Sequence, residues 1–79
     1  MRIDKYLKIS RLIKRRTIAN EACNAGRVFV NDKEARSSYN VKIGDIIEIV
    51  FGDKKIKVEV TSIQENVKKD EAKELYKYI

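Results

Sequence analysis

A chain of 79 residues, of which 43% are hydrophobic and 38% charged, can form one small domain but cannot enclose a deep catalytic cleft. With no histidine and one cysteine, Cys23, it cannot form an internal disulfide or a zinc site built from cysteine pairs. The net charge of +6 comes entirely from residues 1–30, which hold eight basic and two acidic residues, because residues 31–79 hold ten of each. Positive charge gathered in one segment is typical of proteins that bind a polyanion.

Charged side chains interrupt the beginning of the chain, where Arg2, Asp4 and Lys5 follow the first methionine. We therefore expect no signal peptide and no membrane-spanning segment. Together with the single cysteine, this predicts a cytoplasmic protein with no membrane partner.

Residues 3–9 are predicted to form a short helix, because Ile3, Tyr6 and Leu7 share one face of a helical wheel. Tyr6 is therefore expected in the core. Basic residues spaced by three or four form a stripe opposite this face: Lys5, Lys8, Arg11 and Arg15. Ser10 competes for backbone hydrogen bonds, so the helix is expected to break across residues 10–14.

A second helix is predicted over residues 17–25, with Thr17 as its N-cap and Gly26 at the C′ position beyond its end. Ala19 and Cys23 are small enough for close packing against the first helix. The predicted inner face consists of Ile18, Ala22 and Ala25.

The remainder is predicted to be mainly β structure. The expected strands are residues 28–30, 46–51 and 55–61. In the last strand Ile56, Val58 and Val60 alternate with polar residues and should face inward. The expected turns are Asn31–Asp32 and Gly52–Asp53, and residues 37–45 form a loop. In this loop Tyr39 could either stack on a base or anchor the loop.

The tail, residues 68–79, is predicted to form a short helix that either folds back on the sheet or frays. Its apolar stripe consists of Ala72, Leu75, Tyr76 and Ile79.

The segment from Ser10 to Thr17 joins the two predicted helices and holds four basic residues in eight. Thr17 and the free backbone N–H groups that begin the second helix favour phosphate, and arginine can bind phosphate in a bidentate way. Arg11 could instead pair with Asp4 and hold the helices together. The candidate RNA-binding residues are Arg2, Lys5, Lys8, Ser10, Arg11, Lys14, Arg15, Arg16, Thr17 and Arg27. No paired carboxylates are present for acid–base chemistry, and no metal or cofactor is expected.

Several short motifs together resemble the S4-type RNA-binding domain. They are Ser10-Arg11-Leu12, Lys14-Arg15-Arg16-Thr17, Ala19, Gly26-Arg27-Val28, Val30-Asn31, Val41 and Gly44-Asp45. The resemblance implies an α+β fold in which two N-terminal helices pack on a small, twisted, mostly antiparallel sheet. It covers residues 1–61, which leaves residues 62–79 as a C-terminal extension.

Residues 2–8, the Phe51-Gly52 turn and the short charged tail are similar to the stand-alone bacterial S4 proteins of ribosome-associated quality control. This resemblance implies a monomer that binds the rRNA and the P-site peptidyl-tRNA of a stalled large ribosomal subunit. It also implies work beside the elongation partner RqcH while alanine is added to the nascent chain. The RNA contacts that it carries over are Arg2, Arg11, Lys14, Arg15, Arg16 and Thr17.

Two alternatives remain at the level of sequence, and a third is disfavoured by size. An S4 heat-shock protein that recycles large subunits with stranded tRNA has related motifs. A DNA-binding helix-turn-helix factor is permitted by the two helices, although the second offers few base-reading side chains beyond Asn20 and Asn24. A pseudouridine-forming enzyme would need a catalytic domain that 79 residues cannot hold.

Overall fold

The computed structural model describes all residues, Met1–Ile79, and begins with helix α1 (Ile3–Ile9), as predicted. Its apolar face, Ile3, Tyr6 and Leu7, is fully buried. The helix ends at Ser10, whose hydroxyl donates a hydrogen bond to the carbonyl oxygen of Leu7 (3.2 Å). The break predicted after residue 9 is confirmed, and its cause is this local bond.

Helix α2 (Arg16–Asn24) begins at Arg16, whereas a helix with Thr17 as its N-cap would begin two residues later, at Ile18. Arg15 has the extended backbone of the N-cap, and no side chain caps the helix. The prediction that Thr17 is the N-cap is therefore wrong. Arginine is a good helix former, so Arg16 can extend the helix toward its N-terminus.

The buried face of α2 also differs from the predicted one. Ala19 and Cys23 are buried, as close packing against α1 required, but Ile18 is 47% exposed and Ala25 is exposed. The reason is that α2 lies mainly beside α1 and touches the sheet only near the strand that follows it. Burial and the nearby Asp4 charge raise the pKa of the Cys23 thiol to about 11, so it stays protonated near neutral pH.

Five antiparallel strands form one sheet in the order β2-β1-β3-β4-β5. Their bounds are β1 Val28–Val30, β2 Lys33–Glu34, β3 Ile46–Phe51, β4 Lys54–Val60 and β5 Tyr76–Tyr78. β1 and β3 match the predicted residues, and β4 is displaced by one. Neither edge strand, β2 or β5, was predicted, because each is too short to show a period of two in the sequence.

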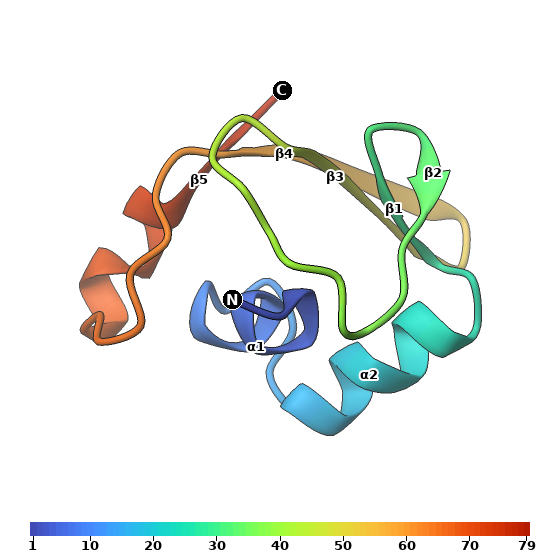
Figure 1. Ribbon diagram of the computed structural model, residues 1–79, viewed down its shortest axis with the longest axis horizontal. Helices are drawn as coiled ribbons and strands as arrows, with labels where there is room; N and C mark the ends of the chain where they lie inside the picture. Colours follow the sequence, from blue (N-terminus) through green and yellow to red (C-terminus); the bar gives the residue numbers. More distant parts are fainter.

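The molecule has two layers, with both helices beneath one face of the sheet (Figure 1). α1 lies under the middle strands, whereas α2 lies toward the end that carries β1 and β2. The core between the layers includes residues of α1, Ala19 and Cys23 of α2, the inward residues of β1, β3 and β4, and Leu75 of the tail. No helix is long and apolar enough to cross a bilayer. The α+β, S4-like fold predicted from the sequence is confirmed.

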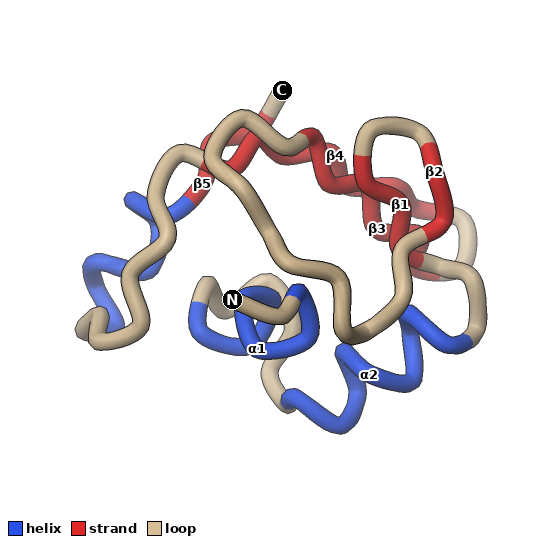
Figure 2. The backbone as a smooth tube through the Cα atoms, in the orientation of Figure 1, coloured by secondary structure: helices blue, strands red, loops and turns tan.

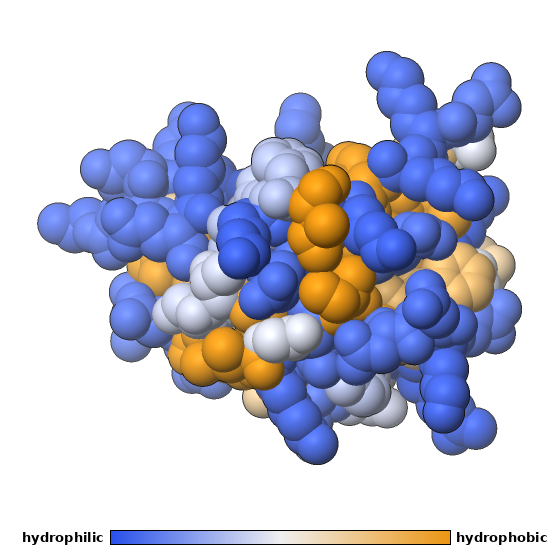
Figure 3. Space-filling view, turned by 90° about the horizontal axis from the view of Figure 1, so that it is seen from above, coloured by the Kyte–Doolittle hydropathy of each residue, from blue (hydrophilic) through white to orange (hydrophobic).

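The opposite face of the sheet is turned toward the viewer in Figure 3, where hydrophilic side chains surround a smaller apolar area. In β4, Lys55 and Lys57 lie on this outer face because Ile56, Val58 and Val60 alternate with them and point inward. This confirms the predicted alternation of the strand.

The chain between β2 and β3 forms a long loop that runs beside α1 in the view of Figure 2. Asp45, at its end, is buried and accepts hydrogen bonds from the Asn31 amide (3.2 Å), the Tyr39 hydroxyl (2.8 Å) and the Lys42 backbone N–H (2.9 Å). The bond to Asp45 raises the pKa of Tyr39. Tyr39 is therefore a loop anchor, and its backbone carbonyl accepts the N–H of Ile3 (2.8 Å), which fixes the start of α1.

The predicted C′ glycine and the predicted Asn31–Asp32 turn are confirmed, and all three residues have positive φ. Gly26 follows α2 with φ +72, and a Cβ there would lie 2.6 Å from a carboxylate oxygen of Glu34. Asn31 and Asp32 form the β1–β2 turn with φ of 52° and 69°.

The tail folds back on the sheet, but it is not one helix. Residues Lys69–Leu75 form a 3-10 helix (η1), and the chain then pairs with β4 as β5. Leu75 is buried, and its carbonyl oxygen accepts the Tyr6 hydroxyl at 2.6 Å. Ile79, predicted on the apolar stripe, is 66% exposed because the helix ends before it. Residues 69–78 thus join the same sheet and core as the first sixty residues.

Candidate nucleic-acid interface

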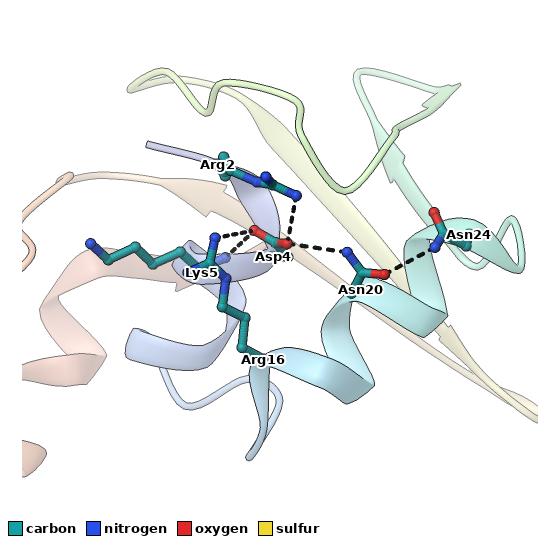
Figure 4. A network of polar contacts seen from close by, with 6 residues as sticks. All are labelled: Arg2, Asp4, Lys5, Arg16, Asn20 and Asn24. Carbon is teal, nitrogen blue, oxygen red and sulfur yellow. Dashed lines mark hydrogen bonds and ion pairs between the residues drawn. The ribbon is translucent and has the colours of Figure 1, made fainter.

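Asp4 is an acidic residue of α1 that is only 2% exposed and lies between Arg2 and Arg16 (Figure 4). Its carboxylate lies 3.1 Å from the Arg2 guanidinium and 3.4 Å from the Arg16 guanidinium. The Asn20 amide (3.3 Å) and the Lys5 backbone N–H (2.8 Å) also donate to it. The predicted alternative in which Arg11 pairs with Asp4 is wrong, because Arg2 and Arg16 occupy that carboxylate.

These contacts link the two helices, since Asp4 lies on α1 and its partners Arg16 and Asn20 lie on α2. The Arg2 and Arg16 side chains remain 47% and 48% exposed. A guanidinium carries five N–H donors, so each arginine keeps donors free for a second acceptor. Asp4 therefore fixes the position of two cationic side chains without using up their hydrogen-bonding capacity.

Burial raises the pKa of the Asp4 carboxyl, but the hydrogen bond from Asn20, the charge of Arg16 and the Lys5 N–H outweigh it, and the pKa lies below the ordinary value of 3.8. A group whose pKa is lower in the folded than in the unfolded protein stabilises the fold above its unfolded pKa. This contribution is lost as the pH falls through the folded pKa.

Replacing Asp4 by asparagine should lower the free energy of unfolding at pH 7 by about 1–2 kcal/mol, because charged hydrogen bonds are lost. The difference from the original protein should shrink as the pH falls below 3.8, the ordinary pKa at which the unfolded chain takes up the proton, and should vanish below the lower pKa of the folded protein. Urea denaturation at pH 7 and at pH 3 measures both effects. A difference that is the same at both pH values would show that the Asp4 charge does not stabilise the fold.

The turn between the helices presents further cations. Arg11 follows the end of α1 with φ +64, a position that favours glycine. A non-glycine residue there costs roughly 1–2 kcal/mol, so the chain keeps a cation where the backbone alone would select glycine. Ser10, predicted as an RNA contact, is 1% exposed, and its hydroxyl donates a hydrogen bond to the Leu7 carbonyl oxygen. It lies below the surface and cannot reach a ligand.

The beginning of α2 adds backbone donors. The first helical hydrogen bond runs from the Ala19 N–H to the Arg15 carbonyl (3.0 Å), so earlier N–H groups have no partner within the helix. Arg15, Arg16 and Thr17 are all exposed around these groups. The helix dipole and the arginine side chains act in the same direction on an anion at this position.

A polar cavity of about 460 Å³ lies between the end of α1 and the segment before η1. Lys8, Arg11 and Lys14 line it together with Glu65. The Glu65 carboxylate also lies 3.4 Å from the Lys5 ammonium, and both side chains are partly exposed. Three cations in one cavity, beside a single carboxylate, provide a second place for phosphate.

Seven basic residues therefore share the surface formed by α1, the turn after it and the start of α2. We call this surface the cationic face; it consists of Arg2, Lys5, Lys8, Arg11, Lys14, Arg15 and Arg16. Thr17 lies at its edge on α2. Arg27 is exposed beyond the far end of α2, beside the β3–β4 turn, and so lies apart from the other candidates.

The sequence analysis missed Asn20 and Glu65 as parts of this surface. Asn20 lies one helical turn beyond Arg16 on α2, a spacing that puts both beside the same neighbour, and this signal was available. Glu65 had no such signal, because it reaches Lys5 only through the folded position of the tail.

Comparison with known proteins identifies relatives of the whole chain. A family model described as S4 domain matches residues 1–47. The RQC P-site tRNA stabilizing factor of Halalkalibacterium halodurans is 53% identical over 76 residues, which cover 96% of this chain and 86% of that protein. The protein of the same name from Bacillus subtilis is 46% identical over 76 residues, covering 96% of this chain and 88% of that one.

Two solved structures are also similar over the full length of this chain. Heat shock protein 15 of Vibrio cholerae, solved as a trimer, has a TM-score of 0.92 and 29% identity, and 81% of that chain is covered. The solution structure of the hypothetical protein HP1423 has a TM-score of 0.85 and 32% identity, with 96% of that chain covered.

Proposed function

This chain belongs to the S4 domain family, and we propose that it is an RNA-binding factor of bacterial ribosome-associated quality control. It binds the stalled large ribosomal subunit, where it contacts rRNA and the peptidyl-tRNA in the P site. It thereby supports RqcH-dependent addition of alanine to the nascent chain. We propose that it works in the cytoplasm as a monomer, by binding and without catalysis.

The observation that carries this proposal is identity of 46–53% over 96% of the chain to proteins named RQC P-site tRNA stabilizing factor. The covered residues include α1, the turn and α2, and so include most of the cationic face. The resemblance to the stand-alone S4 protein RqcP, from residues 2–8 onward, points to the same process.

The cationic face supports RNA as the ligand. Arg15 and Arg16 flank the free N–H groups of α2, and Lys8, Arg11 and Lys14 line the polar cavity. Such donors suit phosphate oxygens and offer little that could read a base edge. Recognition should therefore depend on RNA shape and backbone position. We propose that phosphate contacts come from Arg2, Lys5, Lys8, Arg11, Lys14, Arg15, Arg16 and Thr17.

A second candidate function is recycling of large subunits that carry stranded tRNA. The close superposition on Vibrio cholerae heat shock protein 15 favours it, because that structure covers the whole of this chain. Its identity is only 29%, however, against 53% for the quality-control relative. We therefore keep quality control as the first candidate. Loss of alanine tailing on deletion of the gene would separate the two.

The first test is co-sedimentation with large subunits that carry peptidyl-tRNA. The protein should sediment with them at low salt and be released as salt rises, because phosphate contacts release counterions. Replacing Lys14 by alanine should weaken binding about five- to tenfold, the worth of one exposed charge-assisted contact.

The matched control is Lys57→Ala, which removes the same charge from the outer face of the sheet. It should sediment as the original protein does. Equal losses in the two variants would mean that net charge and not the cationic face governs binding. Failure of the original protein to sediment with stalled subunits would contradict the proposed function itself.

A further inference from the structure

An apolar notch lies between α2, the turn before it and the end of β3. Two adjoining cavities, of about 310 and 430 Å³, form it and share Ile13, Ile18 and Phe51 as lining residues. In Figure 1 the β3–β4 turn lies at the same end of the molecule as the end of α2. The notch is therefore a second surface feature, separate from the polar cavity beside α1.

The notch holds apolar side chains that the fold leaves uncovered. Five large apolar residues of the chain are exposed, and two of them, Ile18 (47%) and Phe51 (39%), line this notch. A domain of 79 residues has little apolar surface to spare, since its core is small. Two such side chains beside one hollow mark a surface that a ligand can cover.

The rim of the notch is cationic. Lys14 and Arg15 line it on the α2 N-terminal side and Arg27 on the other side, whereas Glu21 is the one acidic lining residue. An apolar floor with an aromatic ring and a basic rim matches one nucleotide, whose base is flat and apolar on its faces and whose phosphate is an anion. A purely apolar segment of a protein partner would leave these three cations without partners.

The notch is continuous with the cationic face, because Lys14 and Arg15 belong to both. An RNA strand that lies along the cationic face can therefore place its next nucleotide over the notch without leaving the protein. Arg27 lies apart from the other basic candidates, and in this site it would form the far rim of the notch.

We infer that the notch lined by Ile18 and Phe51 receives one unpaired nucleobase of the RNA whose phosphates lie on the cationic face. This inference rests on the proposed function. It adds a contact to a base, whereas the cationic face contacts only phosphates. The protein should therefore prefer RNA with a bulged or looped-out nucleotide. Stacking accepts every base, so no preference for one base is expected.

The test compares two RNA hairpins that carry the same phosphates. One has a single bulged uridine, and the other has an abasic nucleotide at the bulge. The original protein should bind the first hairpin about tenfold more tightly. This factor lies within the range of affinity gained when one base stacks on an aromatic side chain. The Phe51→Ala variant should lose this preference and bind both hairpins with the affinity that the original protein has for the abasic one.

Two matched variants separate the base contact from charge and from general aromatic surface. Tyr78→Ala removes another exposed aromatic, on the edge strand β5 and outside the notch, and should keep the tenfold preference. Lys8→Ala, at a residue that lines the polar cavity and not the notch, should weaken binding to both hairpins and keep their ratio. Thermal unfolding of each variant establishes that it is folded.

The outcomes also separate this inference from the proposed function. Equal affinity of the original protein for the two hairpins, or an unchanged preference in Phe51→Ala, overturns the nucleobase site and leaves RNA binding intact. If the original protein binds neither hairpin nor large subunits, the proposed function fails and the inference fails with it.

Discussion

Replacing Arg15 and Arg16 together by alanine should lower the affinity for large ribosomal subunits about a hundredfold, the combined worth of two charge-assisted phosphate contacts. The domain should stay folded. Asp4 keeps its bonds with Arg2, Asn20 and the Lys5 N–H when Arg16 is removed, and Arg15 makes no ion pair in the structure. Only the Arg16 side of the Asp4–Arg16 pair is exposed (48%), but the Asp4 carboxylate keeps three other donors, so loss of the pair should cost only about 1 kcal/mol.

Binding titrations over a series of salt concentrations measure this effect. The slope of log affinity against log salt should become shallower by about two, because two phosphate contacts are lost. The control is Lys55→Ala with Lys57→Ala, which removes two charges from the outer face of the sheet. If the folded variant keeps the affinity of the original protein, the cationic face is not the RNA contact.

Replacing Leu75 by alanine should lower the free energy of unfolding by about 2–5 kcal/mol, the cost of truncating a fully buried leucine. Leu75 is 1% exposed in the core, and its carbonyl oxygen accepts hydrogen bonds from Tyr6, Thr61 and Ser62. A domain of this size has a total stability of roughly 4–12 kcal/mol, so the loss is a large share of it.

Urea denaturation measures the effect as a lower midpoint. Ile79→Ala is the matched control, because Ile79 lies four residues further along the same tail and is 66% exposed. Its truncation should change the free energy of unfolding by less than about 0.5 kcal/mol. Equal midpoints for the two variants would mean that the tail does not contribute to the core.

Local patterns predicted the elements that local forces determine. The bounds of α1 followed from its apolar face and from Ser10, and those of β3 from an apolar run between two glycine turns. The tail misled the analysis because Leu75, Tyr76 and Ile79 fit a helical stripe. The pairing of Tyr76–Tyr78 with β4 depends on a free sheet edge, which no local pattern shows.

The sequence predicted which residues form the candidate site better than it predicted how they are arranged. A cluster of arginines around a helix start can be read from residues 10–17. The buried Asp4 that arranges Arg2 and Arg16, and the exposure of Ile18, depend on how α2 packs beside α1. Ser10 was misplaced because its hydroxyl satisfies its own helix and not a ligand.

The bond between the Tyr6 hydroxyl and the Leu75 carbonyl joins residues 69 positions apart, and this has a consequence for the order of synthesis. At about 5–20 residues per second, roughly 3 to 14 seconds separate the translation of these two residues. During that interval the apolar residues of α1 lack part of their cover, because η1 and β5 have not yet been made. A ribosome that stalled before residue 75 would hold a chain in which the Tyr6 hydroxyl lacks its acceptor.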